Sequence, residues 1–455
     1  MASDPRDTAF RLLQSGQKTQ ATLDRAIEDA AREIDALTPK DRALCNAIVF
    51  GVLRHRGHID HIIRSCARRP FAELDPKVLT LLRIGVFQLV YLDRIPDFAA
   101  IHSSIDLAKV RTGKNAAGFI NAVLRKAADT WRTLDLPDRK RHFPAYLAAG
   151  FSIPQWLGKR WTTRYGKTQT EELGRALLDI PAVTLRVNPM KTSRDKVLND
   201  LCGRGFQAVK TPRSRLGIKL TSPGGPVTDL PGFDAGMFQI QDEAAQLVVE
   251  LLAPKPGERI LDACAGLGTK TCHIGQLMDN RGEIVANDPG AGKHEGLQIE
   301  ASRLGLTQIS TTALDIRKTG MKDFGGYFDR VLVDAPCTGL GVLRRNPDTR
   351  WKRTAKDITR MAAIQKKILK ASASLVAPGG VLVYAVCSCE PEENEEVIRH
   401  FLEKRKDFIP DPGGFSAHLP GFSNPDRPGF QFGTFPVYKD MDGFFTARMK
   451  RKQTP

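Results

Sequence analysis

Two short stretches of the sequence place cysteine where an apolar run ends. VLVDAPCTG carries Asp334 and Cys337, and VLVYAVCSC carries Cys387 and Cys389. Any one free cysteine is most often a buried small hydrophobic residue, but a thiolate is also a strong nucleophile once a neighbouring group activates it. Both runs are typical of strands in a parallel sheet, whose ligands gather at the carboxyl ends of the strands. Cys337 and Cys387 would then face one cleft, a coincidence that is harder to explain by packing alone.

Closely spaced cysteines could instead bind a metal ion. The eight cysteines include no CxxC pair, and Cys387 and Cys389 have no nearby histidine to complete four zinc ligands. His55, His58 and His61 recur every three residues, which places the outer two poorly for one metal and favours a solvated basic helix face. The sequence predicts no metal site, and its cysteine usage favours the reducing cytoplasm.

A glycine-containing loop, CAGLGTK at residues 264–270, indicates a different kind of ligand. It follows an apolar run ending at Asp262 and precedes a helical pattern. Small residues there would let the backbone and the helix N-terminal amides approach a ligand. Asp288 ends the next apolar run, where a carboxylate could accept both hydroxyls of a ribose. Tight packing and helix capping explain the two features about as well, so the pattern alone leaves both interpretations open.

A basic stretch with one aromatic residue, LRRNPDTRWKR, follows Cys337. Guanidinium groups suit phosphates, and an aromatic ring can stack on a base. Such a run can also be an ordinary solvated surface, but its place beside a candidate catalytic strand end favours contact with a nucleic acid. The residues expected to bind RNA are Arg344, Arg345, Arg350, Trp351 and Lys352.

The composition agrees with a polyanionic partner. The 68 Lys and Arg against 51 Asp and Glu give a formal net charge of +17, although a membrane surface or solubility would also account for it. The N-terminal stretch has no apolar core of signal-peptide length. The apolar runs are shorter than the roughly 18 residues of a membrane-spanning helix. We therefore expect a protein that is neither exported nor membrane-embedded.

More than one domain must position these residues, because 455 residues exceed one hydrophobic core of usual size. Residues 1–145 repeat apolar positions every three or four residues, which predicts an all-helical domain. Residues 146–238 are typical of a linker followed by a small α+β module. In residues 239–455 apolar strands alternate with helices, which predicts an α/β domain with a mainly parallel sheet covered on both faces.

Taken together, these features resemble the Sun family of RNA cytosine-5 methyltransferases, with the domain order of its RsmB-like branch. In the C-terminal part, the resemblance is carried by DAPCTGLGVLRRNPDTRW, YAVCSCEPEEN, IQDEAAQ and DGFFTARMKR. In the N-terminal part, DRALCNAIVFGVLR, LLRIGVFQLVYLDRIPDFAAIHSSIDLAK and GFINAVLRKA resemble a NusB-like RNA-binding domain. The resemblance covers nearly the whole chain. It implies a NusB-like helical domain, a small α+β RNA-binding module and a Rossmann-like methyltransferase domain.

The resemblance implies S-adenosyl-L-methionine as the cofactor. The family's first motif usually reads CAAPGGKT, whereas this chain has CAGLGTKT and departs from it at Gly266, Leu267 and Thr269. Asp288 matches the acid that holds the ribose, and Asp315 matches the acid near the adenine. The residues expected to bind the cofactor are Cys264, Ala265, Gly266, Leu267, Gly268, Thr269, Lys270, Asp288, Asp315 and Asp334.

The resemblance also implies the chemistry. Carbon 5 of cytosine is a poor nucleophile until a thiolate adds to carbon 6, and Cys387 matches the family residue that does so. Asp334 would bind the base near ring nitrogen 3, and Cys337 matches the residue that assists release of the methylated base. Cys389 has no counterpart in the family. The expected activity is methylation of carbon 5 of a cytosine in 16S rRNA through a covalent cysteine adduct.

Two other functions stay open. One is the same chemistry on another RNA. The other is a non-catalytic RNA-binding or ribosome assembly factor whose cofactor loop has decayed, which the altered first motif permits. Retention of Asp334, Cys337 and Cys387 favours the enzyme.

Overall fold

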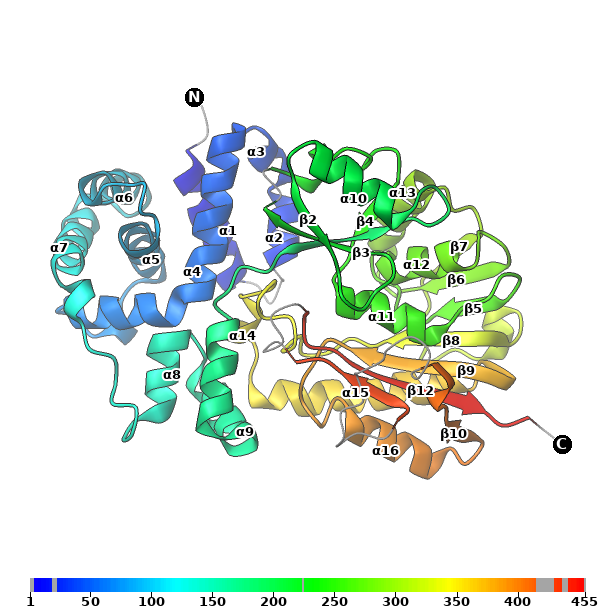
Figure 1. Ribbon diagram of the computed structural model, residues 1–455. Helices are drawn as coiled ribbons and strands as arrows, with labels where there is room; N and C mark the ends of the chain where they lie inside the picture. The colour runs from blue at the N-terminus through cyan, green and yellow to red at the C-terminus, as the bar shows by residue number, and fades with distance from the viewer. Residues whose placement is uncertain (1–3, 19–22, 223–224, 415–428, 436–440, 454–455) are drawn as a thin grey trace. The chain divides into compact units, whose positions relative to one another are not determined.

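The computed structural model describes residues 4–18, 23–222, 225–414, 429–435 and 441–453. The chain divides into two compact units, a helical unit of residues 1–180 with 343–354 and a second unit of residues 181–342 with 355–455 (Figure 1). The second unit contains both the α+β module and the large sheet. The short segment 343–354 therefore interrupts the second unit in the sequence but packs in the helical unit.

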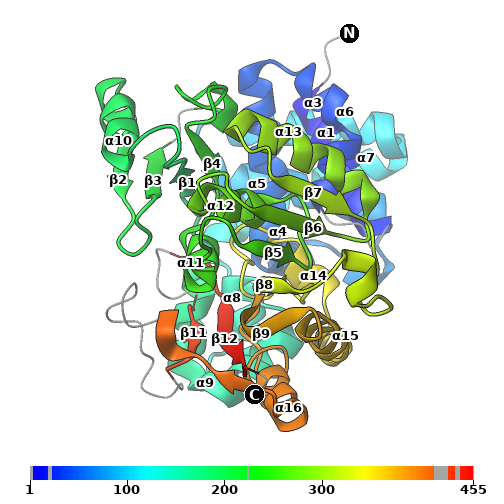
Figure 2. The same ribbon diagram turned by 90° about the vertical axis from the view of Figure 1, so that its right-hand side faces the viewer.

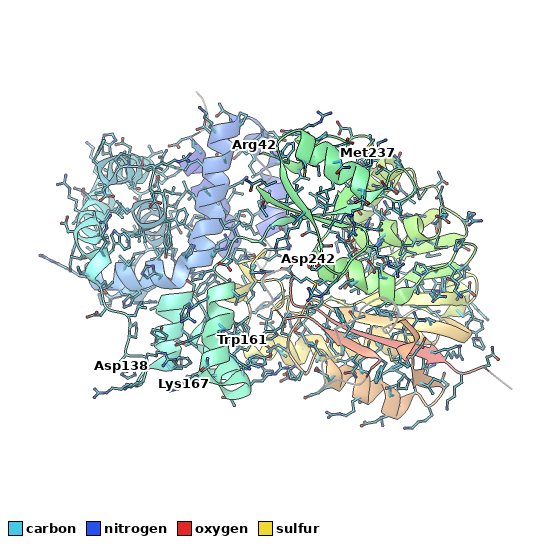
Figure 3. All side chains as sticks on the ribbon, in the orientation of Figure 1. Arg42, Asp138, Trp161, Lys167, Met237 and Asp242 are labelled. Carbon is cyan, nitrogen blue, oxygen red and sulfur yellow. The ribbon has the colours of Figure 1, made fainter. Side chains whose placement is uncertain are left out.

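The helical unit is built from helices that bury one face each. α4 and α5 begin after the capping side chains of Thr38 and Asp75 and have a proline in the first turn. They pack closely where Gly51 meets Phe87, because a Cβ at Gly51 would lie 2.0 Å from the Phe87 ring. Trp161 on α9 is also buried (Figure 3). The helices are α1 (Pro5–Lys18), α2 (Leu23–Asp29), α3 (Ala31–Asp35), α4 (Pro39–Cys66), α5 (Pro76–Tyr91), α6 (Asp97–Thr112), α7 (Lys114–Thr130), α8 (Phe143–Phe151), α9 (Gln155–Ala176) and α14 (Thr349–Lys352).

The α+β module is a four-stranded antiparallel sheet with the order β2-β3-β1-β4. Its strands are β1 (Val183–Val187), β2 (Gln207–Lys210), β3 (Gly217–Ser222) and β4 (Phe238–Ile240), with helix α10 (Arg194–Gly203) between β1 and β2. Alternate strand residues, Leu185, Ile218, Leu220 and Phe238, are buried with Leu201 of α10. The alternating pattern in the sequence thus correctly predicts this module.

The large sheet has the strand order β10-β12-β9-β8-β5-β6-β7, and β11 pairs with β12. β5 to β9 run parallel, whereas β10, β11 and β12 join by antiparallel pairing. The strands are β5 (Arg259–Asp262), β6 (Glu283–Asn287), β7 (Ile309–Thr312), β8 (Phe328–Asp334), β9 (Val376–Val386), β10 (Phe408–Pro410), β11 (Gln431–Gly433) and β12 (Phe445–Arg451). This mainly parallel sheet confirms the predicted α/β class.

Helices cover both faces of this sheet (Figure 2). One face packs against α11 (Glu243–Leu252), α12 (Thr269–Leu277) and α13 (His294–Leu304), and the other against α15 (Ala355–Ala373) and α16 (Glu395–Lys404). Neighbouring strand residues point to opposite faces. Ile260 therefore belongs to the core under α11 and α12, while Leu261 belongs to the core under α15 and α16. Strands buried on both faces explain the continuous apolar runs in the sequence.

The carboxyl ends of β9, β8, β5 and β6 bring the predicted site residues to one edge of the sheet. The chain adds β6 and β7 on one side of β5, then returns to place β8 and β9 on its other side. Ligands of such sheets bind at the carboxyl ends, where the strand order reverses. Asp262, Asp288, Asp334 and Cys387 all lie at these ends.

Within the described segments, no helix is both long and apolar enough to cross a lipid bilayer.

Candidate active site

The loop after β5 depends on glycine to reach its shape. Gly266 and Gly268 have positive φ angles of 57° and 78°, which residues with a Cβ rarely adopt. A Cβ at Gly268 would also lie 2.3 Å from the Leu297 Cγ, so α13 packs directly against the loop. Gly266 stands where the family motif usually has alanine, and Leu267 at the neighbouring departure is 58% exposed. The altered residues therefore fit the observed turn and do not disrupt it.

Asp288 ties the loop after β5 to the end of β6. Its carboxylate accepts hydrogen bonds from the Gly266 N–H (3.1 Å) and the Gly290 N–H (2.8 Å). It also forms an ion pair with Lys293 at 3.1 Å. Asp315, after β7, forms a two-bond pair with Arg317, whose hydrogen bond lowers the pKa of Asp315. Carboxylate oxygens accept hydrogen bonds, so both side chains could bind ribose hydroxyls or the amino group of an adenine.

Lys270 and Asp334 join the first turn of α12 to the end of β8. The Lys270 Nζ lies 2.6 Å from an Asp334 oxygen, and the lysine side chain is 13% exposed. Burial opposes the charge of Lys270, but the charge of Asp334 and its hydrogen bond outweigh burial and raise the lysine pKa. Cys387 raises it further. The site therefore holds a cation close to the Asp334 carboxylate and the Cys387 sulfur.

The two cysteines predicted to act together are in contact. The Cys337 Sγ and Cys387 Sγ atoms lie 3.2 Å apart, beyond the ends of the neighbouring strands β8 and β9. The hydrogen bond to Cys387, together with burial, raises the pKa of Cys337 well above its ordinary value. Cys337 therefore stays a thiol at neutral pH and can donate its proton to Cys387.

Two other cysteines near this edge have different surroundings. Burial raises the pKa of the Cys264 thiol in the cofactor loop, so Cys264 stays protonated and suits packing or a hydrogen bond. Cys389 is buried, 7% exposed. Its lack of a catalytic role stays a prediction.

The basic stretch after Cys337 lies in the helical unit. Arg350 is 1% exposed and donates to the carbonyls of Leu343 (3.1 Å), Ser152 (3.3 Å) and Leu177 (3.3 Å). The Trp351 indole N–H donates to the Leu53 carbonyl at 2.7 Å. These contacts attach residues 343–354 to α4, α8 and α9.

The remaining members of this stretch are held in the same way. The Arg344 carbonyl accepts a hydrogen bond from Arg54 (2.7 Å), and Arg344 is itself 4% exposed. Lys352 pairs with Asp348 at 3.1 Å, while Arg345 is half-buried. Buried guanidinium groups are poorly placed for phosphate contact, so the predicted RNA contact falls mainly on Arg345, Trp351 and Lys352. It stays a prediction.

The histidine series has separate partners. His55 stacks on Tyr91, with ring centroids 4.1 Å apart, and His58 Nδ1 lies 2.6 Å from the Tyr91 hydroxyl. Burial lowers the pKa of His55 to about 4. The expectation of a solvated basic face was therefore wrong for these two residues, because Tyr91 packs against them. Among the described residues, no group of three or more His, Cys, Asp or Glu could hold a metal ion.

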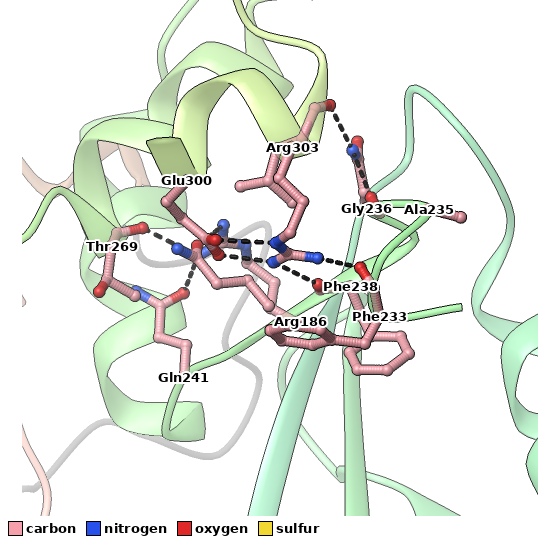
Figure 4. Close-up of polar contacts among 12 residues, drawn as sticks. Arg186, Phe233, Ala235, Gly236, Phe238, Gln241, Thr269, Glu300 and Arg303 are labelled. Atoms are coloured by element: carbon pink, nitrogen blue, oxygen red, sulfur yellow. Dashed lines mark hydrogen bonds and ion pairs between the residues drawn. The ribbon is translucent and has the colours of Figure 1, made fainter. Parts of the chain in front are cut away.

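Two arginines fix the α+β module to the cofactor-loop side of the large sheet (Figure 4). Arg186 on β1 is fully buried and donates to the Thr269 carbonyl at 3.0 Å and to Gln276 Oε1 at 3.2 Å. Burial lowers the pKa of Arg186 to about 9. Arg303 of α13 donates to the Phe238 carbonyl at 3.1 Å. Because Thr269 begins α12, the module contacts the part of the chain that shapes the cofactor loop.

Sequence analysis missed one buried acidic residue at this edge. Glu393 lies in the run EPEENEE, which is typical of a solvated surface, but it is 0% exposed. Its carboxylate accepts hydrogen bonds from Thr338 and Ser388, the residues that directly follow Cys337 and Cys387. The only sequence signal is its position shortly after the second cysteine.

Three family models match the chain in the expected domain order. Residues 3–129 match the NusB family, residues 153–228 match an RsmF/B-like methyltransferase ferredoxin-like domain, and residues 249–450 match 16S rRNA methyltransferase RsmB/F. The first match lies within the helical unit, and the third contains all strands of the large sheet except the last residue of β12.

Known proteins resemble the chain over most of its length. A protein of Bacillus subtilis (strain 168), named probable ribosomal RNA small subunit methyltransferase B, is 36% identical over 451 residues, which are 98% of each chain. A solved structure named PH0851 has a TM-score of 0.82 and 26% identity, and covers 99% of this chain and 100% of its own. NSun6 from Pyrococcus horikoshii, solved with SFG, has a TM-score of 0.59 and 22% identity, and covers 67% of this chain and 100% of its own.

Proposed function

Because the chain belongs to the ribosomal RNA small subunit methyltransferase B family, we propose that it methylates carbon 5 of a cytosine in 16S rRNA. Family membership accounts for methylation of ribosomal RNA. The ring position, the covalent route and action in the cytoplasm are parts of the proposal. The observation that carries it is the contact of Cys337 and Cys387, 3.2 Å apart beside the Lys270–Asp334 ion pair.

The loops after β5 and β6 suit S-adenosyl-L-methionine. No side chain caps α12 at Gly268, so the first N–H groups of the helix fit the carboxylate of a methionine moiety. Asp288 would accept the ribose hydroxyls and Asp315 would contact the adenine. When bound, the cofactor supplies an electrophilic methyl group. The structure of the similar NSun6 with SFG, an S-adenosylmethionine analogue, supports this choice.

Cys387 supplies the nucleophile in the proposed reaction. Its thiolate forms a bond to carbon 6, and the electron pair of the ring double bond becomes available at carbon 5. Lys270 stabilises the thiolate before the attack. Asp334 binds the base near ring nitrogen 3 and stabilises the charge that develops there. Carbon 5 can then accept the methyl group.

Cys337 has the position to complete the reaction. After methyl transfer, carbon 5 carries a hydrogen that must leave as a proton while the bond from carbon 6 to Cys387 breaks. Alkylated Cys387 is an uncharged thioether, so the hydrogen bond and charge of Cys387 no longer raise the Cys337 pKa, and only burial and the charge of Glu393 still do. Cys337 then gives up its own proton to solvent water, and the resulting thiolate accepts the proton from carbon 5. In the proposed reaction, Cys387 thus acts as a thiolate while Cys337 is a thiol, and Cys337 acts as a thiolate while Cys387 is a thioether.

We propose that the helical unit and the α+β module recognise the RNA. The helical unit includes the NusB match, and the module is anchored to the cofactor-loop side of the sheet by Arg186 and Arg303. Target choice would then depend on surfaces outside the sheet, and the strand ends would supply the chemistry.

Bisulfite sequencing of 16S rRNA tests the proposal directly. In a strain lacking the gene, one protected cytosine should become convertible, and protection should return with the wild-type gene but not with Cys387→Ala. Cys389→Ala is the matched control and should restore protection. If the pattern of protected cytosines were the same with and without the gene, the cytosine-5 assignment would be wrong.

Calorimetric titration with S-adenosyl-L-methionine distinguishes the assembly-factor alternative from the enzyme. The altered first motif is the observation in its favour, but Gly266 and Gly268 support an ordered turn at that place. Saturable binding would support the enzyme. An absence of binding at millimolar ligand would favour the assembly factor.

A further inference from the structure

Glu393 accepts hydrogen bonds from both loops that carry the paired cysteines. One carboxylate oxygen accepts the Thr338 N–H (2.8 Å) and the Gln365 side-chain N–H (3.0 Å). The other accepts the Thr338 hydroxyl (2.5 Å) and the Ser388 hydroxyl (2.5 Å). Thr338 follows Cys337 in the chain and Ser388 follows Cys387. One side chain therefore connects the two loops next to their sulfur-bearing residues.

The backbone at Glu393 is itself fixed by the strand below it. The Tyr384 hydroxyl, from β9, donates to the Glu393 carbonyl at 2.6 Å, and the Asn394 amide donates to the Ser388 carbonyl at 3.1 Å. Both loops also share two backbone bonds, from the Ala335 N–H to the Ala385 carbonyl (2.9 Å) and from the Gly341 N–H to the Cys387 carbonyl (3.0 Å). Glu393 thus adds a side-chain link where the pairing of β8 and β9 has ended.

The surroundings of Glu393 suit positioning better than proton transfer. Burial raises the pKa of Glu393, and the hydrogen bonds from Ser388, Thr338 and Gln365 oppose that effect. Four donors occupy the two carboxylate oxygens, and a carboxylate in such a set acts as a fixed acceptor. Breaking such a buried network leaves donors unpaired, which is costly.

We propose that Glu393 is a positioning residue that sets the separation of the Cys337 and Cys387 sulfurs. The hydrogen bonds by which Glu393 links the two loops are called the clamp below. The catalytic importance of the sulfur separation rests on the proposed function, but the clamp itself does not. Removing the carboxylate frees both loops, so the two sulfurs spend less time in contact. Small displacements of reacting groups can cost about 100-fold in rate.

Thiol–disulfide exchange measures this separation without RNA or cofactor. In a glutathione buffer, the Cys337 and Cys387 thiols react with one glutathione disulfide and yield a protein disulfide and two reduced glutathione molecules. The equilibrium constant reports how often the two sulfurs meet. The measurement uses the full chain with Cys389→Ala, acid quenching, alkylation and peptide mass spectrometry, so that only the 337–387 pair is scored.

Glu393→Ala should lower this equilibrium constant about tenfold, which corresponds to about 30 mV in reduction potential. Glu393→Gln should give an intermediate value. Its amide oxygen can still accept the Thr338 N–H, and the Thr338 and Ser388 hydroxyls can accept hydrogen bonds from its NH₂ group. The matched control is Glu243→Ala. Glu243 is another buried glutamate, which accepts backbone N–H groups of Arg213 and Ser214 away from the cysteines, and its loss should leave the constant within twofold of the parent.

Steady-state methylation provides the second readout. Glu393→Ala should lower kcat at least tenfold and leave the KM for RNA and for the cofactor within about threefold, with partial recovery in Glu393→Gln. If Glu393→Ala fails to fold, Ser388→Ala and Thr338→Val each remove one arm of the clamp and should lower the exchange constant in the same direction. An exchange constant unchanged or raised in the folded variants would overturn the proposal. A lowered constant in a protein without cytosine-5 activity would leave the clamp intact and refute the proposed function.

Discussion

Cys337 and Cys387 are in sulfur–sulfur contact, but their surroundings differ. The hydrogen bond between them and burial raise the pKa of Cys337. Lys270 supplies a positive charge nearby, and its pKa is raised against burial by Asp334 and, less strongly, by Cys387. Cys337 therefore keeps its proton, and Lys270 is the cation near Cys387. This asymmetry gives each residue a separate step in the proposed reaction.

Covalent trapping should show the separate roles of Cys387 and Cys337. Cys337→Ala should still form the bond to carbon 6 and transfer the methyl group, but elimination should be slow, so protein should remain attached to RNA. Cys387→Ala should form no adduct. The measurement is denaturing electrophoresis after incubation with labelled rRNA and S-adenosyl-L-methionine.

The double variant provides the control for trapping. The shifted band should be strong for Cys337→Ala and absent for Cys337→Ala with Cys387→Ala. Cys389→Ala should behave as the wild type does. A band that survived in the double variant and vanished on changing Cys389 would show that Cys389 is the nucleophile.

Asp262 should make the stability depend on pH. Burial raises its pKa from 3.8 to about 6, although a hydrogen bond from Thr271 opposes the shift. A carboxyl group whose pKa is raised by folding stabilises the fold below about pH 4, and this contribution is lost as the pH rises through about 6. Asp262→Asn stays neutral at all these pH values. The free energy of unfolding of Asp262→Asn minus that of the wild type should therefore increase by up to about 3 kcal/mol from pH 4 to pH 7.

Urea unfolding at pH 4 and at pH 7 measures this difference. Asp200→Asn, which changes an exposed carboxylate on α10, is the control and should show the same pH dependence as the wild type. If Asp262→Asn and the wild type kept a constant difference across this range, Asp262 would not be the titrating group.

At the scale of elements, the loops after β5 and β6 form one structure because Asp288 bonds to Gly266 across them. Asp288→Ala should weaken binding of S-adenosyl-L-methionine at least tenfold, since charge-assisted hydrogen bonds contribute about 1.5–3 kcal/mol each. Isothermal titration calorimetry provides the measurement. Glu283→Ala changes a carboxylate at the opposite end of β6 and should leave the Kd unchanged. An unchanged Kd for Asp288→Ala would remove Asp288 from the cofactor site.

Segment 343–354 shows how an element can be assigned to the wrong surroundings from the sequence. Its arginines resemble a nucleic acid contact because guanidinium groups usually lie at the surface. Arg350 is instead buried and donates to backbone carbonyls in the helical unit. The carbonyls that accept these bonds directly follow α8 and α9 and lie 198 and 173 residues earlier in the chain. Local sequence carries no sign of them.

At the scale of the whole molecule, RNA binding by the helical unit should depend on salt. A groove of about 740 Å³ beside α5, α6 and the start of α7 is lined by Arg69, Lys77 and Lys109. Changing these three residues to glutamine should weaken rRNA binding and reduce the magnitude of the slope of log K against log salt by about 2 to 3, because fewer counterions are released. Filter binding at several salt concentrations measures both quantities.

The matched control keeps the charge at these positions. Arg69→Lys with Lys77→Arg and Lys109→Arg should retain the affinity and the salt slope, since the phosphate term depends mainly on charge. Equal slopes for the glutamine and charge-preserving variants would place the RNA contact elsewhere. Deleting residues 1–145 is a poorer test, because segment 343–354 would lose α4, one of the helices it packs against.

The sequence by itself determined the type of each domain and the strand ends that carry the candidate site residues. Helical and strand periodicities depend on neighbours within a few residues, so the helical unit, the α+β module and the parallel sheet could all be predicted. Asp288, Asp334, Cys337 and Cys387 could be found because ligand sites of parallel sheets lie at strand ends, and the family resemblance supplied their expected roles.

Only the tertiary structure decided which charged side chains are buried and what they hold. Glu393 looks solvated within its acidic run, but its donors come from Thr338, 55 residues away, and from Gln365, 28 residues away. Arg350 and His55 likewise find their partners on distant helices. Burying a charge is favourable only where enough hydrogen-bond partners converge on it. That convergence is a property of the folded chain, because residues far apart in the sequence supply the partners.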